Sequence, residues 1–199
     1  KLGVIGAGAW GTALAQALGS DGTPVLLWAR EPELVDEINT RRTNSLFLPS
    51  ARLSDSVRAT GAIADLAEAT VLLAVVPAQF LGSVLAGLPA GAPDLGLWAQ
   101  GIEAGAGRPM ADVARDAVPG ARLAVLSGPT FAHEVAAGLP TAVTLACEGG
   151  EAQWERLAPV LARPALRPYY SDDVIGAEIG GAVKNVLAIA CGVVEGLGL

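Results

Sequence analysis

The chain has 199 residues, of which 52% are hydrophobic, with a mean hydropathy of +0.47 and a formal net charge of −7 at pH 7. An acidic chain without a basic stripe gives no support to a nucleic-acid partner, although local positive groups can still bind an anionic small molecule. The length suits one full domain, or one domain and part of another, with a large core.

The apolar content raises the question of a membrane span, and the longest uncharged run is residues 69–93. A span needs about 20 apolar residues, but Pro77 and Gln79 interrupt this run. We therefore expect a strand, a turn and an apolar helix there, and no membrane span. The N-terminus enters a strand at once, so no signal peptide is visible. Cys147 and Cys191 lie far apart in apolar segments and are expected to be buried thiols of a cytoplasmic protein.

Glycines crowd the beginning of the chain, which reads KLGVIGAGAWGTALAQAL. Residues 1–5 are expected to form a buried strand, and the apolar residues that follow the glycines recur at helical spacing. Between them, Gly6, Gly8 and Gly11 form a G-x-G-x-x-G pattern in the strand–turn–helix context of a dinucleotide fingerprint. Gly6 would permit the tight turn, Gly8 would allow a diphosphate to approach the backbone, and Gly11 would allow the helix to pack closely on the strand. The alternative is a glycine-rich turn that binds no ligand.

The rest of the chain alternates apolar strands with helices. This alternation predicts an α/β fold with a doubly wound, Rossmann-like, mostly parallel sheet covered on both faces. Ligands of such sheets gather at the carboxyl ends of the strands, where Gly6, Pro77, Gln100 and Ser127 directly follow apolar runs. The expected strands are residues 24–28, 57–60, 70–76, 94–99, 122–126, 141–147 and 166–170, and the expected helices are 31–42, 63–69, 79–88, 110–118, 134–138 and 151–161.

From residue 172 onward the pattern predicts one long helix with no strand after it, capped by Asp172 or Asp173. We expect residues 1–171 to form a dinucleotide-binding domain. Residues 172–199 would be the first helix of an all-helical substrate domain whose remainder is absent from this chain. The alternative is that this helix docks on the sheet. Its apolar residues are expected to form a broad buried stripe, made of Ile179, Val183, Val186, Leu187, Ala190 and Val194.

Arg30 lies at the end of the second strand, where NAD-preferring folds carry an acidic residue for the ribose hydroxyl. A guanidinium there can pair with a 2′-phosphate or stack on adenine, which favours NADP or mixed use. The neighbouring Glu31 keeps NAD open. The alternative is an exposed surface arginine.

Two further segments can carry chemistry. The first is SGPTF, residues 127–131, where Thr130 can cap a helix, or the backbone N–H groups and the threonine hydroxyl can bind a substrate carbonyl or phosphate; a simple turn is equally consistent. The second is GGAVKN, residues 180–185, which places Lys184 within an apolar helix. A buried ammonium is costly unless it is paired or its pKa falls, and a lowered pKa suits proton transfer. The alternative is a lysine that extends to solvent from the helix edge, with Glu178 as a candidate partner.

Together GAGAWGTALA, INTRRTNSLFLP, VVPAQ, SGPTFAHEVAAGLPTA and IGGAVKNVLAIACGVVEGLG resemble, in this order, the bacterial NAD(P)-dependent glycerol-3-phosphate dehydrogenase family over essentially all 199 residues. The resemblance implies hydride transfer between NAD(P)H and dihydroxyacetone phosphate to give sn-glycerol 3-phosphate, a phospholipid precursor. The implied partners are NADP or NAD and a phosphorylated small molecule, in a cytoplasmic enzyme for which a homodimer is open. No metal is implied.

The resemblance also implies residue roles. The family's GGAVKN lysine, here Lys184, is the proton donor or acceptor, because carbonyl reduction leaves an alkoxide that needs a proton. The implied cofactor-binding residues are Gly6, Gly8, Ala9, Trp10, Gly11, Arg30, Phe80, Gln100 and Ala132, and the implied substrate-binding residues are Gln100, Gly128, Thr130, Lys184 and Asn185.

Gln100 departs from the family, which usually carries a lysine at this position. Glutamine keeps hydrogen bonding but loses the charge, and a charge-assisted bond is about twice as strong as a neutral one. Two other functions stay open: a β-hydroxyacid dehydrogenase-like enzyme, which SGPTF and NSLFLP argue against, and a non-catalytic dinucleotide-binding module, which Gln100 favours.

Overall fold

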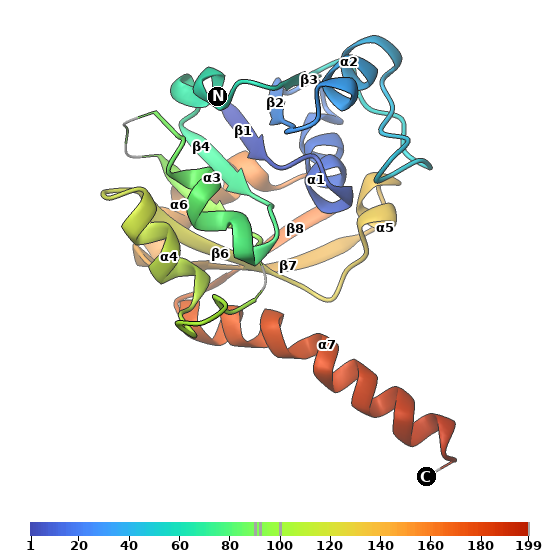
Figure 1. Cartoon of the computed structure of the whole chain (residues 1–199), viewed down its shortest axis with the longest axis vertical. Coiled ribbons are helices and arrows are strands. Elements are labelled where there is room, and N and C mark those ends of the chain that lie inside the picture. The colour runs from blue at the N-terminus through green and yellow to red at the C-terminus, as the bar shows by residue number, and fades with distance from the viewer. Residues whose placement is uncertain (90, 92, 100, 199) are drawn as a thin grey trace.

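The computed structural model of the chain describes residues 1–89, 91, 93–99 and 101–198. At its centre lies an eight-stranded sheet with the strand order β3-β2-β1-β4-β5-β6-β7-β8 (Figure 1). The strands are β1 (Leu2–Ile5), β2 (Val25–Trp28), β3 (Val57–Thr60), β4 (Val71–Ala74), β5 (Asp94–Leu97), β6 (Arg122–Ser127), β7 (Thr141–Cys147) and β8 (Leu166–Ser171).

The first six strands run parallel to one another, and the reversal falls between β6 and β7, which pair antiparallel. β7 and β8 are again parallel to each other. Every residue of β1, β4 and β5 is buried, as expected for central strands covered on both faces. The prediction of a mostly parallel sheet is confirmed.

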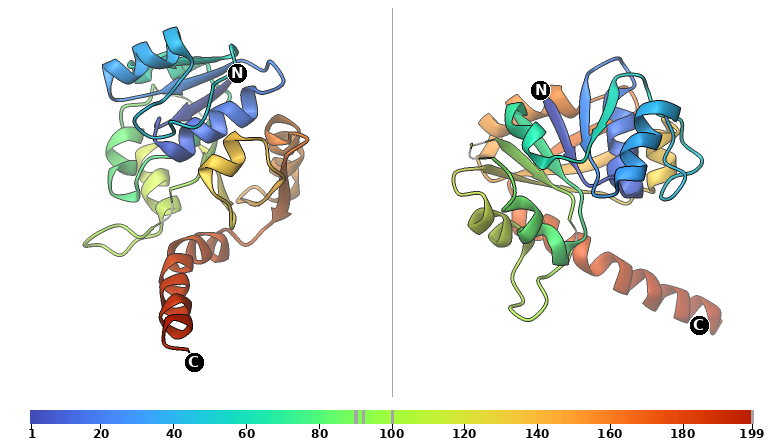
Figure 2. Two further views of the ribbon diagram at one scale, coloured as in Figure 1. Left: turned by 90° about the vertical axis from the view of Figure 1, so that its right-hand side faces the viewer. Right: turned by 45° about the horizontal axis from the view of Figure 1, so that its top comes forward.

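Helices cover both faces of the sheet (Figures 1 and 2). One face packs against α1, α2 and α6, and the other packs against η1, α3 and α4 and the beginning of α7. The doubly wound, Rossmann-like class is therefore confirmed. The α-helices are α1 (Ala9–Gly19), α2 (Pro32–Arg41), α3 (Leu81–Leu85), α4 (Met110–Ala117), α5 (Ala132–Ala136), α6 (Gly150–Leu161) and α7 (Val174–Gly196), and the 3-10 helices are η1 (Ile63–Glu68) and η2 (Ala78–Phe80).

The long uncharged run divides as the sequence predicts, into β4, a turn at Pro77, and the short helices η2 and α3. The other boundaries differ from the expected ones by a few residues, with one more substantial difference. The segment expected as a helix over 79–88 is a 3-10 turn followed by a five-residue α-helix.

α7 runs away from the sheet, so that its far end stands clear of the rest of the chain (Figures 1 and 2). Asp173 caps the helix by accepting a hydrogen bond from the N–H of Gly176 at 2.8 Å, which confirms that prediction. The expectation of a buried stripe is wrong for the described chain, because Gly181 is the only buried residue of α7. The large apolar residues of the stripe are at least 40% exposed, namely Ile179, Val183, Val186, Leu187 and Val194.

Two other properties of α7 follow from this exposure. Cys147 in β7 is buried as expected, but Cys191 in α7 is exposed, so its expected burial is wrong. Among the described helices, only α7 is long and apolar enough to cross a membrane by length and composition, with a mean hydropathy of 1.5. Core helices of soluble proteins share both features.

The close approach of Gly11 to the turn before it predicts a large effect of a single methyl group. A Cβ atom at Gly11 would overlap the carbonyl oxygen of Gly6, whereas a Cβ atom at Gly8 would meet nothing within 4 Å. Because that oxygen belongs to the backbone and cannot rotate away, Gly11→Ala should lower the free energy of unfolding by about 3 kcal/mol or more. Gly8→Ala is the matched control and should stay within about 0.5 kcal/mol of the wild type. Thermal and urea unfolding measure both, and equal stability of the two variants would contradict this packing.

Candidate dinucleotide-binding site

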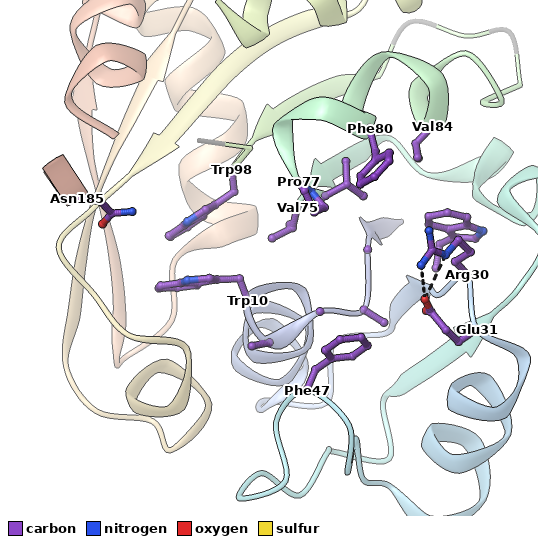
Figure 3. A pocket seen from close by; sticks show the side chains of 16 residues that line it. Trp10, Arg30, Glu31, Phe47, Val75, Pro77, Phe80, Val84, Trp98 and Asn185 are labelled. Atoms are coloured by element: carbon purple, nitrogen blue, oxygen red, sulfur yellow. Dashed lines mark hydrogen bonds and ion pairs between the residues drawn. The ribbon is translucent and has the colours of Figure 1, made fainter. Parts of the chain in front are cut away.

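A cavity of about 610 Å³ opens at the carboxyl ends of β1, β2, β4 and β5. The turn after β1 and the beginning of α1 form one part of its wall, and the segments that follow the other three strands form most of the rest (Figure 3). This position agrees with the rule that open α/β sheets bind ligands beyond the carboxyl ends of their strands. The lining residues are Gly6, Ala7, Gly8, Ala9, Trp10, Trp28, Arg30, Glu31, Phe47, Val75, Val76, Pro77, Phe80, Val84, Trp98 and Asn185.

The glycine turn has the geometry that the sequence predicts. Gly6 has a φ of +108°, which L side chains rarely adopt, and Gly11 packs directly on it. Gly8 lines the cavity and has open space where a side chain would be. No side chain caps α1 at Gly8, so the first N–H groups of the helix are free to bind an anion.

Arg30 and Glu31 line one end of the cavity (Figure 3). The Arg30 guanidinium donates from Nε and Nη2 to Glu31 Oε1, at 3.2 and 2.9 Å. Its side chain is 75% exposed, so it is both a surface arginine and a cavity residue. The two residues from which the sequence predicts the cofactor preference are therefore bonded to each other.

Aromatic side chains give the cavity a largely apolar wall. The indoles of Trp10 and Trp98 stack with their ring centroids 4.9 Å apart, and Figure 3 shows the two rings facing each other. Phe80, expected to pack near a cofactor, lines the cavity together with Phe47. Trp98 and Phe47 also line the cavity, and the sequence did not predict either of them as a site residue. The second of these lies in NSLFLP, which follows an expected helix and reaches the cavity only through the tertiary fold.

α7 contributes two neighbouring residues, Lys184 and Asn185, at or near the cavity. Asn185 lines the cavity at the end opposite Arg30 and Glu31 (Figure 3). The ammonium of Lys184 donates to the carbonyl oxygen of Gly128 at 3.3 Å, and among the described residues it forms no ion pair. Burial, which disfavours the charged form, lowers the pKa of Lys184.

Glu178 does not pair with Lys184, so that candidate pairing is wrong. Its carboxylate accepts a hydrogen bond from the backbone N–H of Ala111 at 2.7 Å, in the first turn of α4. Burial raises the pKa of Glu178 above its ordinary value. Glu178 thus bonds α7 to α4 at a position six residues before Lys184.

Thr130 has a buried hydroxyl oxygen with no hydrogen-bond partner in the described part of the chain. The expectation that it caps the next helix is wrong, since Phe131 occupies the N-cap position of α5 and no side chain bonds there. A buried, unpaired hydroxyl is costly. It lies two residues from Gly128, the partner of Lys184.

Two of the expected cofactor-binding residues that the structure describes, Gly11 and Ala132, do not line the cavity. Gly11 packs behind the turn on Gly6, and Ala132 packs against the cluster that contains Ala13, Leu48 and Val135. Gln100 lies outside the described residues. Within the described ranges, no group of three His, Cys, Asp or Glu residues could hold a metal ion.

The fold and the cavity define a dinucleotide-binding protein of the Rossmann class. The residues fit such a ligand, because the free α1 N-terminus and the open space at Gly8 suit a diphosphate and the aromatic wall suits planar rings. Comparison with known proteins gives the family. The profile of the NAD-dependent glycerol-3-phosphate dehydrogenase N-terminus matches residues 1–153, and that of the C-terminus matches residues 173–199. The chain belongs to the NAD-dependent glycerol-3-phosphate dehydrogenase family.

Individual relatives agree with this assignment. The chain is 69% identical to a glycerol-3-phosphate dehydrogenase [NAD(P)+] of Novosphingobium aromaticivorans and 64% identical to one of Erythrobacter litoralis, in each case over the whole chain and 60% of the relative. The glycerol-3-phosphate dehydrogenase structure from Coxiella burnetii is similar with a TM-score of 0.87 and 36% identity over 98% of this chain and 61% of that one. The glycerol-3-phosphate dehydrogenase structure from Plasmodium falciparum is similar with a TM-score of 0.90 and 26% identity, over 100% of this chain and 60% of that one. The chain thus spans about 60% of the length of the curated relatives it matches.

The open space at Gly8 predicts a defect in ligand binding without a defect in folding. A valine side chain at this position would project into the cavity, where it would occupy the place of a bound diphosphate. Gly8→Val should therefore weaken binding of NADH and NADPH by about tenfold or more, since each 1.4 kcal/mol of lost contact is tenfold. Fluorescence titration measures the affinity, and an unchanged melting temperature serves as the control. Wild-type affinity in a folded variant would place the ligand elsewhere.

Proposed function

We propose that the full-length protein is an oxidoreductase that transfers a hydride between NAD(P)H and dihydroxyacetone phosphate to give sn-glycerol 3-phosphate. The proposal rests on the position of α7, which reaches the cavity formed by the glycine turn. Asn185 on α7 lines the cavity that the glycine turn opens, and the neighbouring Lys184 bonds to Gly128. A proton-transfer group and a dinucleotide-binding turn therefore belong to one site. The relatives that the chain matches are named for this activity.

The orientation of the cofactor follows from the two ends of the cavity. We place the diphosphate at Gly8, Ala9 and Trp10, where the helix N-terminus favours negative charge. The adenosine end then lies toward Arg30, and the nicotinamide lies toward Asn185. Phe80 packs along the cofactor, and Gln100 completes the proposed contacts.

The chain supplies the proton of the reaction. Reduction of the ketone adds a hydride to carbon, which the bound nicotinamide supplies, and a proton to oxygen, which Lys184 donates. In the oxidation direction the neutral Lys184 amine accepts that proton. The lowered pKa of Lys184 increases its neutral fraction near pH 7 and makes its ammonium a stronger acid.

The substrate is assigned to the groups beside this amine. Thr130 would donate or accept a hydrogen bond through its unpaired hydroxyl, and Gly128 and Asn185 would flank the carbonyl and its phosphate. Gln100 would contribute a neutral hydrogen bond where the family usually has a charge. Both the cofactor and the substrate are anionic small molecules.

The domain division is also a proposal. Residues 1–171 would be the dinucleotide-binding domain, and residues 172–199 would begin a helical substrate domain. The profile of the family's C-terminus at residues 173–199 and the exposed apolar side chains of α7 support this division. We propose a cytoplasmic enzyme and a homodimer, which sedimentation of the full-length protein would test.

Replacing the lysine tests its proposed role. Lys184→Met in the full-length protein should lower kcat by about 10²- to 10⁴-fold, the usual contribution of a general acid or base. Binding of NADPH should change little, because Lys184 itself does not line the cavity. Lys184→Arg is the matched variant: it keeps the positive charge but does not release its proton. Substantial activity of Lys184→Arg would mean that only the charge matters.

The pH dependence of the wild-type reaction should also reveal the titration of Lys184. Because a neutral amine is needed to accept the proton, kcat/KM for glycerol 3-phosphate oxidation should rise with pH and level off below the ordinary lysine pKa. Turnover of a 3-hydroxy acid without turnover of glycerol 3-phosphate would favour a β-hydroxyacid dehydrogenase. Tight binding of NADPH without turnover of either substrate would favour a non-catalytic module.

The Arg30–Glu31 pair predicts a change in cofactor preference. Glu31→Gln removes the anion that holds the guanidinium, so Arg30 becomes free to pair with a 2′-phosphate. The KM for NADPH should fall by about threefold or more, while the KM for NADH should not fall, since an exposed charged pair is worth up to about 1 kcal/mol. Steady-state assays with both cofactors measure the ratio. A shift toward NADH would mean that Glu31 does not compete with the cofactor for Arg30.

A further inference from the structure

Asn44 is a fully buried polar side chain in the loop between α2 and β3. Its amide nitrogen donates to the carbonyl oxygen of Ala7 at 2.9 Å and to the hydroxyl of Thr12 at 2.7 Å. Its amide oxygen accepts the N–H of Phe47 at 2.9 Å. The Thr12 hydroxyl, also fully buried, donates to the same Ala7 carbonyl at 3.2 Å. A buried amide is tolerated only when it is bonded in this way.

These bonds join two parts of the cavity wall that are 40 residues apart in the sequence. Ala7 is part of the glycine turn, and Phe47 lies in the NSLFLP loop, yet both line the cavity. One side chain therefore sets the position of the loop relative to the turn. Phe47 is held through its backbone N–H, so its ring stays free to face the cavity (Figure 3).

The bond to Ala7 also fixes the direction of a neighbouring donor. The carbonyl of Ala7 and the N–H of Gly8 belong to one peptide unit, and the described chain contains no cis peptide bond. In a trans unit these two groups point in opposite directions. Because Asn44 and Thr12 hold the carbonyl toward the protein interior, the Gly8 N–H must point to the other side, where Gly8 lines the cavity.

We infer that Asn44, assisted by Thr12, is a positioning residue for the dinucleotide. It holds the glycine turn so that the Gly8 N–H faces the diphosphate, and it holds Phe47 beside it. The inference deepens the proposed function and rests on it. Since the diphosphate is common to NADH and NADPH, the effect of Asn44 must be the same for both cofactors, unlike the effect of Arg30 and Glu31.

Asn44→Asp in the full-length protein tests this inference, with Asn39→Asp as the matched control. Aspartate keeps the acceptor for Phe47 but loses both donors and sets a carboxylate against the Ala7 carbonyl. Asn39 makes the same kind of paired bonds, donating to Ala59 O and accepting from Ala59 N at 2.9 Å each. Those bonds tie α2 to β3, and neither residue lines the cavity.

The expected result is that Asn44→Asp raises the Kd of NADH and of NADPH by the same factor of about ten or more, because a buried donor pair is lost. Its kcat at saturating cofactor should stay within about twofold of the wild type, since Lys184 is untouched. Asn39→Asp should lower the melting temperature to a similar extent and leave both Kd values within about twofold.

Thr12 provides a milder pair of variants if Asn44→Asp does not fold. Thr12→Val has nearly the same shape but removes the hydroxyl, so both Kd values should rise by a few fold, whereas Thr12→Ser keeps the hydroxyl and should bind as the wild type does. Equal affinity of Thr12→Val and Thr12→Ser would overturn the inference. Unchanged Kd values in Asn44→Asp, or an equal increase in Asn39→Asp, would overturn it as well. Failure of the wild type to bind either nucleotide would overturn the proposed function and the inference together.

Discussion

The packing of Gly11 on the carbonyl of Gly6 is the constraint on which the site depends. It lets α1 begin immediately after β1, so the free N–H groups of the helix face the carboxyl edge of the sheet. A side chain at Gly11 would push the helix away, and the cavity would lose the wall that suits an anion. Asn44 also shapes the glycine turn, because its bond to the Ala7 carbonyl orients the peptide unit between Ala7 and Gly8.

The second element of the site is α7, which the described chain holds only at its beginning. Asp173 caps it, Glu178 bonds to the first turn of α4, and Lys184 bonds to Gly128. Val174 and Ala177 also pack against the core at the beginning of the helix, whereas the large apolar residues from Ile179 onward are exposed. The opposite pKa directions of Glu178 and Lys184 have one cause, since burial disfavours the charged form of each. The amine that would move the proton is thus placed by the same helix that leaves the sheet.

Local patterns predicted the parts of the structure that local physics controls. The glycine turn, the buried strands and the Asp173 cap depend on neighbouring residues, so their sequence signals are specific. The positions of Phe47 and Trp98 could not be predicted, because the contacts that bring them to the cavity, Asn44 with Ala7 and Trp98 with Trp10, join residues that become neighbours only in the fold. Helical periodicity identified the apolar side of α7, but periodicity does not say what covers that side. The expected cap at Thr130 was wrong because Phe131 takes the N-cap position of α5, and the Thr130 hydroxyl is buried without a partner in the described part of the chain.

The central claim is that the cavity holds the nicotinamide beside Lys184. A crystal structure of the full-length protein with NADP⁺ and glycerol 3-phosphate tests it most directly. The account predicts the diphosphate at the α1 N-terminus and the Lys184 amine about 2.6–3.2 Å from the hydroxyl that loses its proton. A nicotinamide bound away from Asn185, with Lys184 still on Gly128 and remote from the substrate, would contradict it.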